Sequence, residues 1–397
     1  MNSSHDAGKL RALLKTRNQF SKRELETLLN TLQNSPISPR LKPFADRLVV
    51  AGVALSARAE GNLKKLEVKN DAILGDVLSD TGGLIQRTRL IHQRVAAPVL
   101  RYSPDDEIAL KVIVWMHRQH VRTSTIPAAC TAGETSIWPL LDIAPIYFVP
   151  CMEGRGLLYL SLLFHEFGHL LYALSVYRQE MDDLVQELQQ KIEASLHQLS
   201  GRNDHHSNAQ AELVRAIVET WYSWTQEFFC DAVGLHLGGA AYLNAFSSYT
   251  HFLQSSDYVV GPDDLRSSTH PRSWLRIRLL TERARRLGFE GAANAIELDW
   301  QIAGEQLRVD EDYHGYFNDA LQDELQNTLD DMLTTAELEP DALAFGLSFA
   351  DCQKEWTPDQ SPVVLLNNAW KKARTSTASE FATWEEAAIP RLVSSPD

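Results

Sequence analysis

The stretch His165-Glu166-Phe167-Gly168-His169 decides how the rest of the chain is interpreted. On a helix, positions i and i+4 share one face, so His165 and His169 can grip one metal ion while the carboxylate of Glu166 lies beside it. Two imidazoles and a carboxylate at this spacing are typical of metal-assisted hydrolysis. The residues around the motif must show whether it has that meaning here.

The motif lies inside the longest apolar run of the chain, Leu157 to Val176. This run approaches the length that spans a membrane, but two histidines, a glutamate and a glycine occupy its middle. We therefore expect a buried helix in a soluble protein, without a membrane partner.

The composition indicates which partners and which cellular compartment to expect. The chain has 397 residues, 44% of them hydrophobic, and a formal net charge of −14, which argues against a nucleic-acid partner because phosphate binding needs a concentrated basic surface. The N-terminus lacks the apolar core of a signal peptide. Four cysteines without CxxC spacing then indicate reduced thiols, and we expect a cytoplasmic protein; they are Cys130, Cys151, Cys230 and Cys352.

The patterns along the chain predict four regions. Residues 1–40 are expected to form a basic helical arm, in which Ser21 to Glu24 have the pattern of a capping box, and residues 41–125 a helical lobe. Residues 126–290 hold the motif. Residues 291–397 are expected to form an acidic helical lobe, and an apolar stripe there either packs on the protein's own core, which we favour, or docks a protein partner; it comprises Phe317, Leu321, Leu325, Leu329 and Leu333.

A short β-prone run precedes the motif, from Ile146 to Val149, and prolines bracket it. This pattern is typical of an edge strand, where missing amide donors are tolerated. Gly168 costs about 1 kcal/mol in a helix relative to alanine, so we expect it to permit a close backbone neighbour, and this strand is the candidate.

Two histidines do not complete a catalytic zinc site, which takes three protein ligands and one open position. Glu227 is the candidate for the third ligand, because it lies among Trp224, Phe228 and Phe229, where a carboxylate is costly to bury without a cation. Asp231 follows at i+4. It can accept the free ring N–H of a ligating histidine and fix its tautomer.

A further motif runs from Ser268 to Pro271. Thr269 can cap a helix whose first turn contains Pro271, which would place His270 at the start of that helix, facing a cleft. An imidazole N–H there can stabilise an oxyanion. Arg276 and Arg278 follow on the same helix, and either can pair with a carboxylate behind the metal.

Together, HEFGH, Glu227-xxx-Asp231 with Gly234, and Thr269-His270-Pro271 with Arg276 resemble the HtpX-like and CAAX prenyl endopeptidase family of gluzincin metallopeptidases over roughly residues 145–285. The resemblance implies His165, His169 and Glu227 as ligands of one catalytic Zn²⁺ and Glu166 as the catalytic base. It also implies that Asp231 holds a ligating histidine by a hydrogen bond, and that His270 and Arg276 have supporting roles. Many members have spanning helices beside the motif. This chain has none, which favours a soluble branch.

We therefore expect a mainly α protein of the α+β class, with a zincin-like core, a small sheet and flanking helical lobes. It would be a zinc metalloendopeptidase that hydrolyses peptide or protein substrates by attack of a zinc-bound water activated by Glu166. The alternative is a catalytically silent or partner-regulated scaffold or sensor, whose acidic C-terminal lobe docks a protein. Other polar residues are interpreted as structural: we expect His117, His120, His205 and His206 at the surface and Cys230 as a buried small residue.

Overall fold

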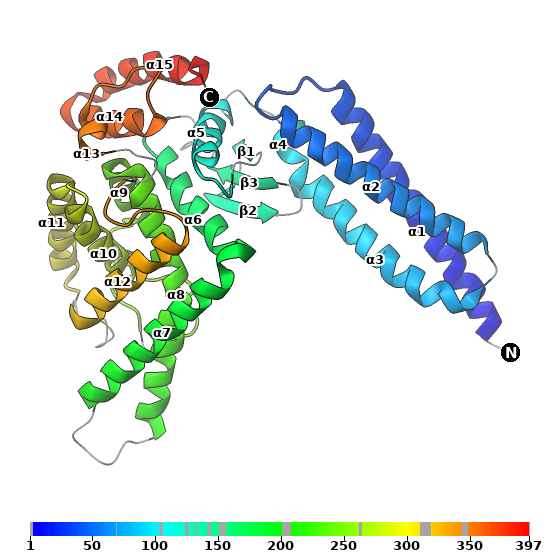
Figure 1. The fold of residues 1–397 in the computed structure, drawn as a ribbon, viewed down its shortest axis with the longest axis horizontal. Coiled ribbons are helices and arrows are strands. Elements are labelled where there is room, and N and C mark those ends of the chain that lie inside the picture. The colour runs from blue at the N-terminus through cyan, green and yellow to red at the C-terminus, as the bar shows by residue number, and fades with distance from the viewer. Residues whose placement is uncertain are drawn as a thin grey trace. The chain divides into compact units, whose positions relative to one another are not determined.

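The computed structural model is mainly helical with one three-stranded sheet, which confirms the predicted fold class (Figure 1). It describes residues 3–68, 70–101, 103, 106–123, 127–131, 133–140, 144–150, 156–200, 208–261, 264–309, 319–343 and 348–396. The chain divides into two compact units: residues 1–132 with 140–148, and residues 133–139 with 149–397. The four predicted regions stay predictions.

The first unit consists of helices and two strands. Its elements are α1 (Ser3–Asn34), α2 (Lys42–Glu67), η1 (Asp71–Ile73), α3 (Leu74–Leu90), η2 (Ile91–Val95), α4 (Ala97–Leu100), α5 (Asp106–Gln119), β1 (Ala128–Thr131) and β3 (Ala144–Val149). A core of Leu14, Leu66, Leu74 and Val77 joins α1, α2 and α3. Because α1 is continuous from Ser3, Ser21 lies in the helix interior, and its prediction as a cap was wrong.

The remaining elements belong wholly or mainly to the second unit. They are β2 (Ser136–Leu140), η4 (Leu160–Leu162), α6 (Leu163–Ala173), α7 (Ser175–Ser200), α8 (Asn208–Gly238), α9 (Ala240–Thr250), η5 (Ser255–Asp257), α10 (Ser273–Arg286), α11 (Glu290–Leu307), α12 (Asp319–Thr335), α13 (Phe349–Gln353), α14 (Pro362–Thr375) and α15 (Ala378–Ser394). None of the described helices combines the length and apolarity that crossing a bilayer requires.

The strand order is β1-β3-β2. β3 is therefore the central strand of the three, and the prediction of an edge strand at Ile146 to Val149 was wrong. Pro145 is the second residue of β3 and Pro150 directly follows its last residue, while all six residues of the strand are buried. The two prolines therefore mark the ends of the strand and do not indicate an exposed edge. β1 and β2 have no counterpart among the strands predicted from the sequence.

Two histidines of the first unit are buried, against the prediction that they lie at the surface. The side chain of His117 is 0% exposed and that of His120 is 2% exposed. Nε2 of His117 lies 2.7 Å from the hydroxyl of Tyr147, and its Nδ1 lies 2.8 Å from the carbonyl oxygen of Thr123. Burial lowers the pKa of His117 to about 4, so it is neutral at pH 7. His205 and His206 lie outside the described residues.

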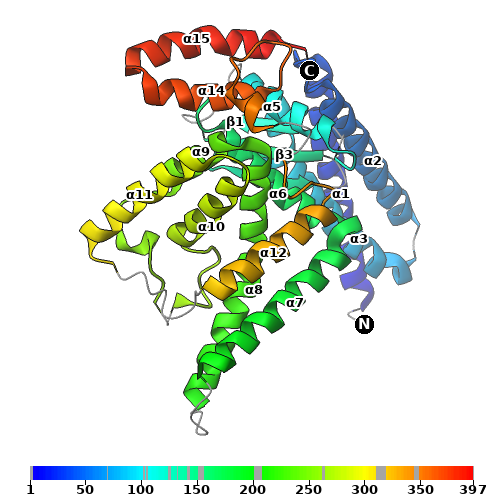
Figure 2. The same cartoon turned by 60° about the vertical axis from the view of Figure 1, so that its left-hand side comes forward.

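α6 packs directly on α8 in the second unit (Figure 2). A Cβ placed on Gly168 would lie 2.7 Å from Cα of Cys230 in α8, closer than ordinary contact allows. The close neighbour of Gly168 is therefore α8, and the prediction that it is the strand at Ile146 to Val149 was wrong.

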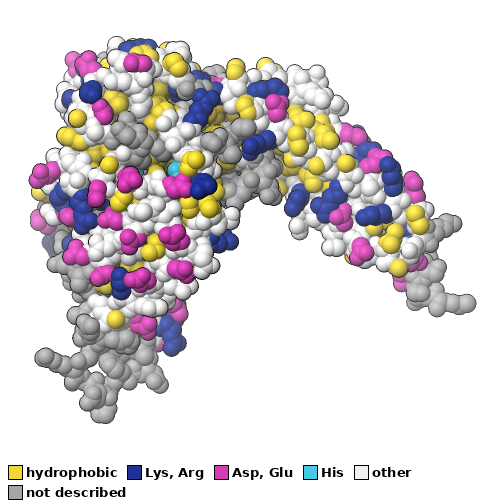
Figure 3. All heavy atoms as spheres, viewed as in Figure 1, with side chains coloured by type: hydrophobic (Ala, Val, Ile, Leu, Met, Phe, Trp, Pro, Cys, Tyr) yellow, Lys and Arg dark blue, Asp and Glu magenta, His cyan; other side chains and the backbone are white. Residues whose placement is uncertain are grey.

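The apolar stripe of α12 packs on the core, as favoured from the sequence. Leu321, Leu325, Leu329 and Leu333 are each at most 2% exposed, whereas Phe317 lies outside the described residues. Acidic side chains are frequent on the visible face over α7 and α12 (Figure 3).

Candidate metal centre

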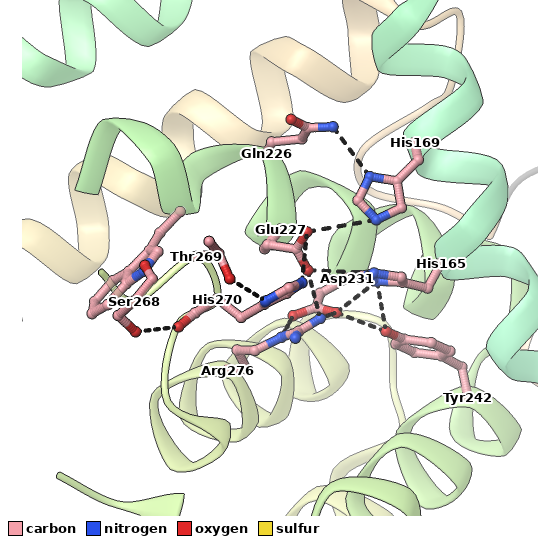
Figure 4. Close-up of polar contacts among 11 residues, drawn as sticks. His165, His169, Gln226, Glu227, Asp231, Tyr242, Ser268, Thr269, His270 and Arg276 are labelled. Carbon is pink, nitrogen blue, oxygen red and sulfur yellow. Dashed lines mark hydrogen bonds and ion pairs between the residues drawn. The ribbon is translucent and has the colours of Figure 1, made fainter. Parts of the chain in front are cut away.

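α6 and α8 together present two histidines and a glutamate to one cleft of about 580 Å³ (Figure 4). His165 and His169 lie one helical turn apart on α6, and Glu227 faces them from α8. The Glu227 carboxylate reaches both rings. Its Oε2 lies 3.5 Å from Nε2 of His165, and its Oε1 lies 3.6 Å from Nε2 of His169.

The other nitrogen of each ring has a partner of its own. Nδ1 of His165 lies 3.0 Å from Oδ1 of Asp231, and the side-chain amide of Gln226 lies 3.1 Å from Nδ1 of His169. Both Nε2 atoms are consequently directed at Glu227. Tyr242 of α9 donates a hydrogen bond of 2.8 Å to Asp231, which fixes the carboxylate behind His165.

Arg276 of α10 holds the two carboxylates of α8 in place. Its guanidinium donates two hydrogen bonds to Asp231, of 2.6 and 2.7 Å, and lies 3.4 Å from Glu227. Burial opposes ionisation of Asp231, but Arg276 outweighs it and holds the pKa of this carboxyl below its usual range. Burial likewise opposes ionisation of Glu227, and contacts with His165 and Arg276 lower its pKa to about 2.

Glu166 lines the same cleft and is only 8% exposed. Burial raises the pKa of Glu166, while nearby His165 and a hydrogen bond from the backbone N–H of Ile137 in β2 oppose the rise. A carboxylate in this setting is a stronger base than one in water. β2 therefore contributes to the site, which the sequence did not indicate.

His270 lines the cleft, but it does not start a helix. α10 begins at Ser273, so Thr269 does not cap it; the Thr269 hydroxyl lies 2.9 Å from Nδ1 of His270 instead. The His270 side chain is 63% exposed, and its Nε2 lies 3.8 Å from Oε1 of Glu227. Its imidazole is thus free to meet a molecule that enters the cleft.

Residues 159–284 match the model of peptidase family M48. No curated protein and no solved structure shows significant similarity to the chain. The M48 match spans α6, α8 and α9 and reaches residue 284 of α10, so it contains every cleft residue named above except Ile137. It supports the coarser prediction of a zincin-type metallopeptidase.

Within the M48 segment, Cys230 also lies near the two histidines. One ligand atom from each of His165, His169 and Cys230 falls within 4.8 Å of the others. The thiol, however, is fully buried beneath Gly168 and does not line the cleft, and burial raises its pKa well above the usual value. Because Glu227 lines the cleft and faces the Nε2 atoms of both histidines, it is the better third donor.

The M48 segment holds two site residues that sequence reasoning missed, Gln226 and Tyr242. Gln226 directly precedes Glu227, where helical spacing alone does not show which side chain turns toward His169. Tyr242 lies on a different helix from the motif, and only the packing of α9 brings its hydroxyl to Asp231.

Proposed function

We propose that the chain is a zinc-dependent metalloendopeptidase. The observation that carries the proposal is the pair of Nε2 atoms facing Glu227, each on a ring whose Nδ1 already has a partner. In proteins, metal-ligating histidines commonly use one nitrogen for the metal and the other for a hydrogen bond of this kind. The M48 match of residues 159–284 supports the same function.

The donor set fits zinc. His165, His169 and Glu227 supply two nitrogens and one carboxylate, and their position on the wall of the cleft leaves room for a fourth, exchangeable ligand. When His169 binds metal through Nε2, its Nδ1 carries the proton. Gln226 then accepts through its side-chain oxygen, an orientation that exchanges the two ends of the amide.

Zinc at these three residues would polarise the substrate carbonyl and lower the pKa of water. The chain's own residues do the proton transfer. Glu166 takes the proton from the attacking water and then delivers it to the leaving amine, a task suited to its raised pKa. The N–H of Ile137 keeps the Glu166 carboxylate directed into the cleft.

His270 and Arg276 have different supporting roles in this proposal. His270 is exposed within the cleft, where its ring N–H can donate to the oxyanion that forms on the carbonyl oxygen when water attacks the carbonyl carbon. Arg276 is a positioning residue, because it is buried against Asp231 and Glu227. An HtpX-like, soluble branch of the family and a cytoplasmic setting stay predictions.

Purified protein tests the proposal in two steps. We expect about one zinc per chain by elemental analysis, and loss of zinc in Glu227→Gln. In Glu166→Gln we expect zinc to remain while peptide cleavage falls about 100-fold or more. Glu180→Gln, an exposed position on α7, is the matched control and should cleave as the native chain does.

Cells expressing the native chain or Glu166→Gln provide the substrate assay. New protein termini found only with the native chain would identify what is cut. If purified protein and cells show no cleavage under any condition although zinc is bound, the scaffold or sensor alternative replaces the enzyme.

A further inference from the structure

A second cavity, of about 380 Å³, lies among the C-terminal helices of the second unit. Its lining comes wholly from residues 353–391, on α13, α14, α15 and the segment before α14, and it shares no residue with the metal cleft. α14 and α15 lie side by side in both views (Figures 1 and 2). Its volume falls within the range of small-molecule sites, roughly 300–1,000 Å³.

The cavity has an aromatic and apolar floor. Trp356 is 7% exposed, Leu365 and Ala388 are buried, and Trp384 is half-buried. Indole faces of this kind bind flat rings by stacking, with centroids about 4.5–7 Å apart. The guanidinium of Arg391 lies 5.6 Å from the centre of the Trp356 ring, and the ring of Phe381 lies 6.0 Å from that of Trp384. Trp384 is the more exposed of the two indoles, so we assign it as the surface for a ligand ring.

The rim of the cavity is cationic, in the most acidic part of the chain. From Gly291 onward there are 21 acidic and 6 basic residues, the latter being Arg308, Lys354, Lys371, Lys372, Arg374 and Arg391. Half of these basic residues line the cavity, namely Lys371, Lys372 and Arg391, and all three are exposed.

These three cations lack close acidic partners. Among the residues that the structure describes, none of them has a carboxylate oxygen within ion-pair distance, whereas Lys354 of the same lobe pairs with Asp351 at 2.6 Å. Hydrogen bonds from Thr377 lower the pKa of Glu380, and Lys372 adds a smaller lowering over a longer range. Glu355 is the acidic residue of the lining. Like charges around one cavity repel each other, so an anion between them is stabilised.

We propose that this cavity binds a small aromatic anion. The anionic group lies between Lys371, Lys372 and Arg391, and the flat ring packs against Trp384. Asn368 fixes the geometry of the site, because it accepts from the backbone N–H of Trp356 and donates to the carbonyl oxygen of Lys354.

Isothermal titration calorimetry on the full, zinc-loaded chain tests the proposal with three probes. Adenosine 5′-monophosphate has both a ring and an anion, adenosine has the ring alone, and inorganic phosphate has the anion alone. We expect one adenosine 5′-monophosphate to bind per chain. Adenosine and inorganic phosphate should each bind at least about tenfold more weakly, because adenosine lacks the contacts with the cations and phosphate lacks the contact with the indole ring. Higher salt should weaken the binding.

Two variants place the binding in the cavity. Lys371→Gln and Trp384→Leu should each weaken it about tenfold. Lys354→Gln is the matched control, because it also removes one lysine charge from the lobe but lies outside the lining, and it should bind as the native chain does.

Three results would overturn the proposal. The first is no heat with the monophosphate at about 1 mM. The second is binding that neither Lys371→Gln nor Trp384→Leu changes, above all if Glu227→Gln abolishes it, because the phosphate would then sit at the metal centre. The third is equal binding of inorganic phosphate and the monophosphate, which would leave the ring without a role.

Discussion

Replacing Gly168 by alanine tests the contact that sets the spacing between α6 and α8, the two helices proposed to hold the metal. The added Cβ would lie 2.7 Å from Cα of Cys230, 3.1 Å from its Cβ and 3.2 Å from its Sγ. Overpacking of a closed interface costs roughly 1–3 kcal/mol, and the upper end applies because the nearest atom belongs to the backbone of α8. Alanine regains about 1 kcal/mol of helix propensity. The net loss of unfolding free energy is therefore about 2 kcal/mol.

Chemical denaturation of purified protein measures this loss, and a zinc-binding competition measures its effect on the site. We expect Gly168→Ala to bind zinc more weakly, since α6 must move away from Glu227. Gly291→Ala is the control, because a Cβ there meets nothing within 4 Å. Adding Cys230→Ala should not rescue the variant, as the Cα remains. Native stability and zinc affinity in Gly168→Ala would refute the reasoning.

Three further changes probe the rest of the structure. Arg276→Met removes the cation between two buried carboxylates and should cost about 3–5 kcal/mol in a denaturation experiment; a loss below about 1 kcal/mol would contradict the buried ion pair. Gln226→Ala should lower zinc affinity about 10- to 100-fold, while Gln226→Glu, which keeps an acceptor for His169, should bind zinc nearly as the native chain does. His117 has a pKa lowered from 6.5 to about 4, so the unfolded chain takes up its proton first and stability should fall by about 3 kcal/mol as pH drops across that window. The same pH-dependent fall in His117→Gln would show that His117 is not its source.

Local sequence patterns predicted the relative positions of two residues wherever both residues lie on the same helix. His165 with His169 on α6, and Glu227 with Asp231 on α8, are each four residues apart, and the structure brings the two pairs together. The spacing follows from helix geometry alone. Aromatic neighbours of Glu227 correctly indicated a buried carboxylate, which is 8% exposed.

Relationships that depend on packing between distant segments were not predictable in the same way. The partner of Gly168 is set by how α6 lies on α8, and the central position of β3 depends on two strands that are short and carry weak signals. His117 looked like a surface residue near a helix end, because nothing local showed that Tyr147 and Thr123 would satisfy its ring nitrogens. Roles that rest on His165, Glu166, His169, Glu227, Asp231, His270 and Arg276 stay proposals until they are measured.

X-ray absorption at the zinc edge of the zinc-loaded protein tests the central claim most directly, because it identifies the atoms bound to the metal. We predict two imidazole nitrogens at about 2.0–2.1 Å and oxygen donors at about 2.0–2.2 Å, with one imidazole lost in His169→Ala. A sulfur neighbour at about 2.3 Å would place Cys230 on the metal in place of Glu227 and contradict the assigned site.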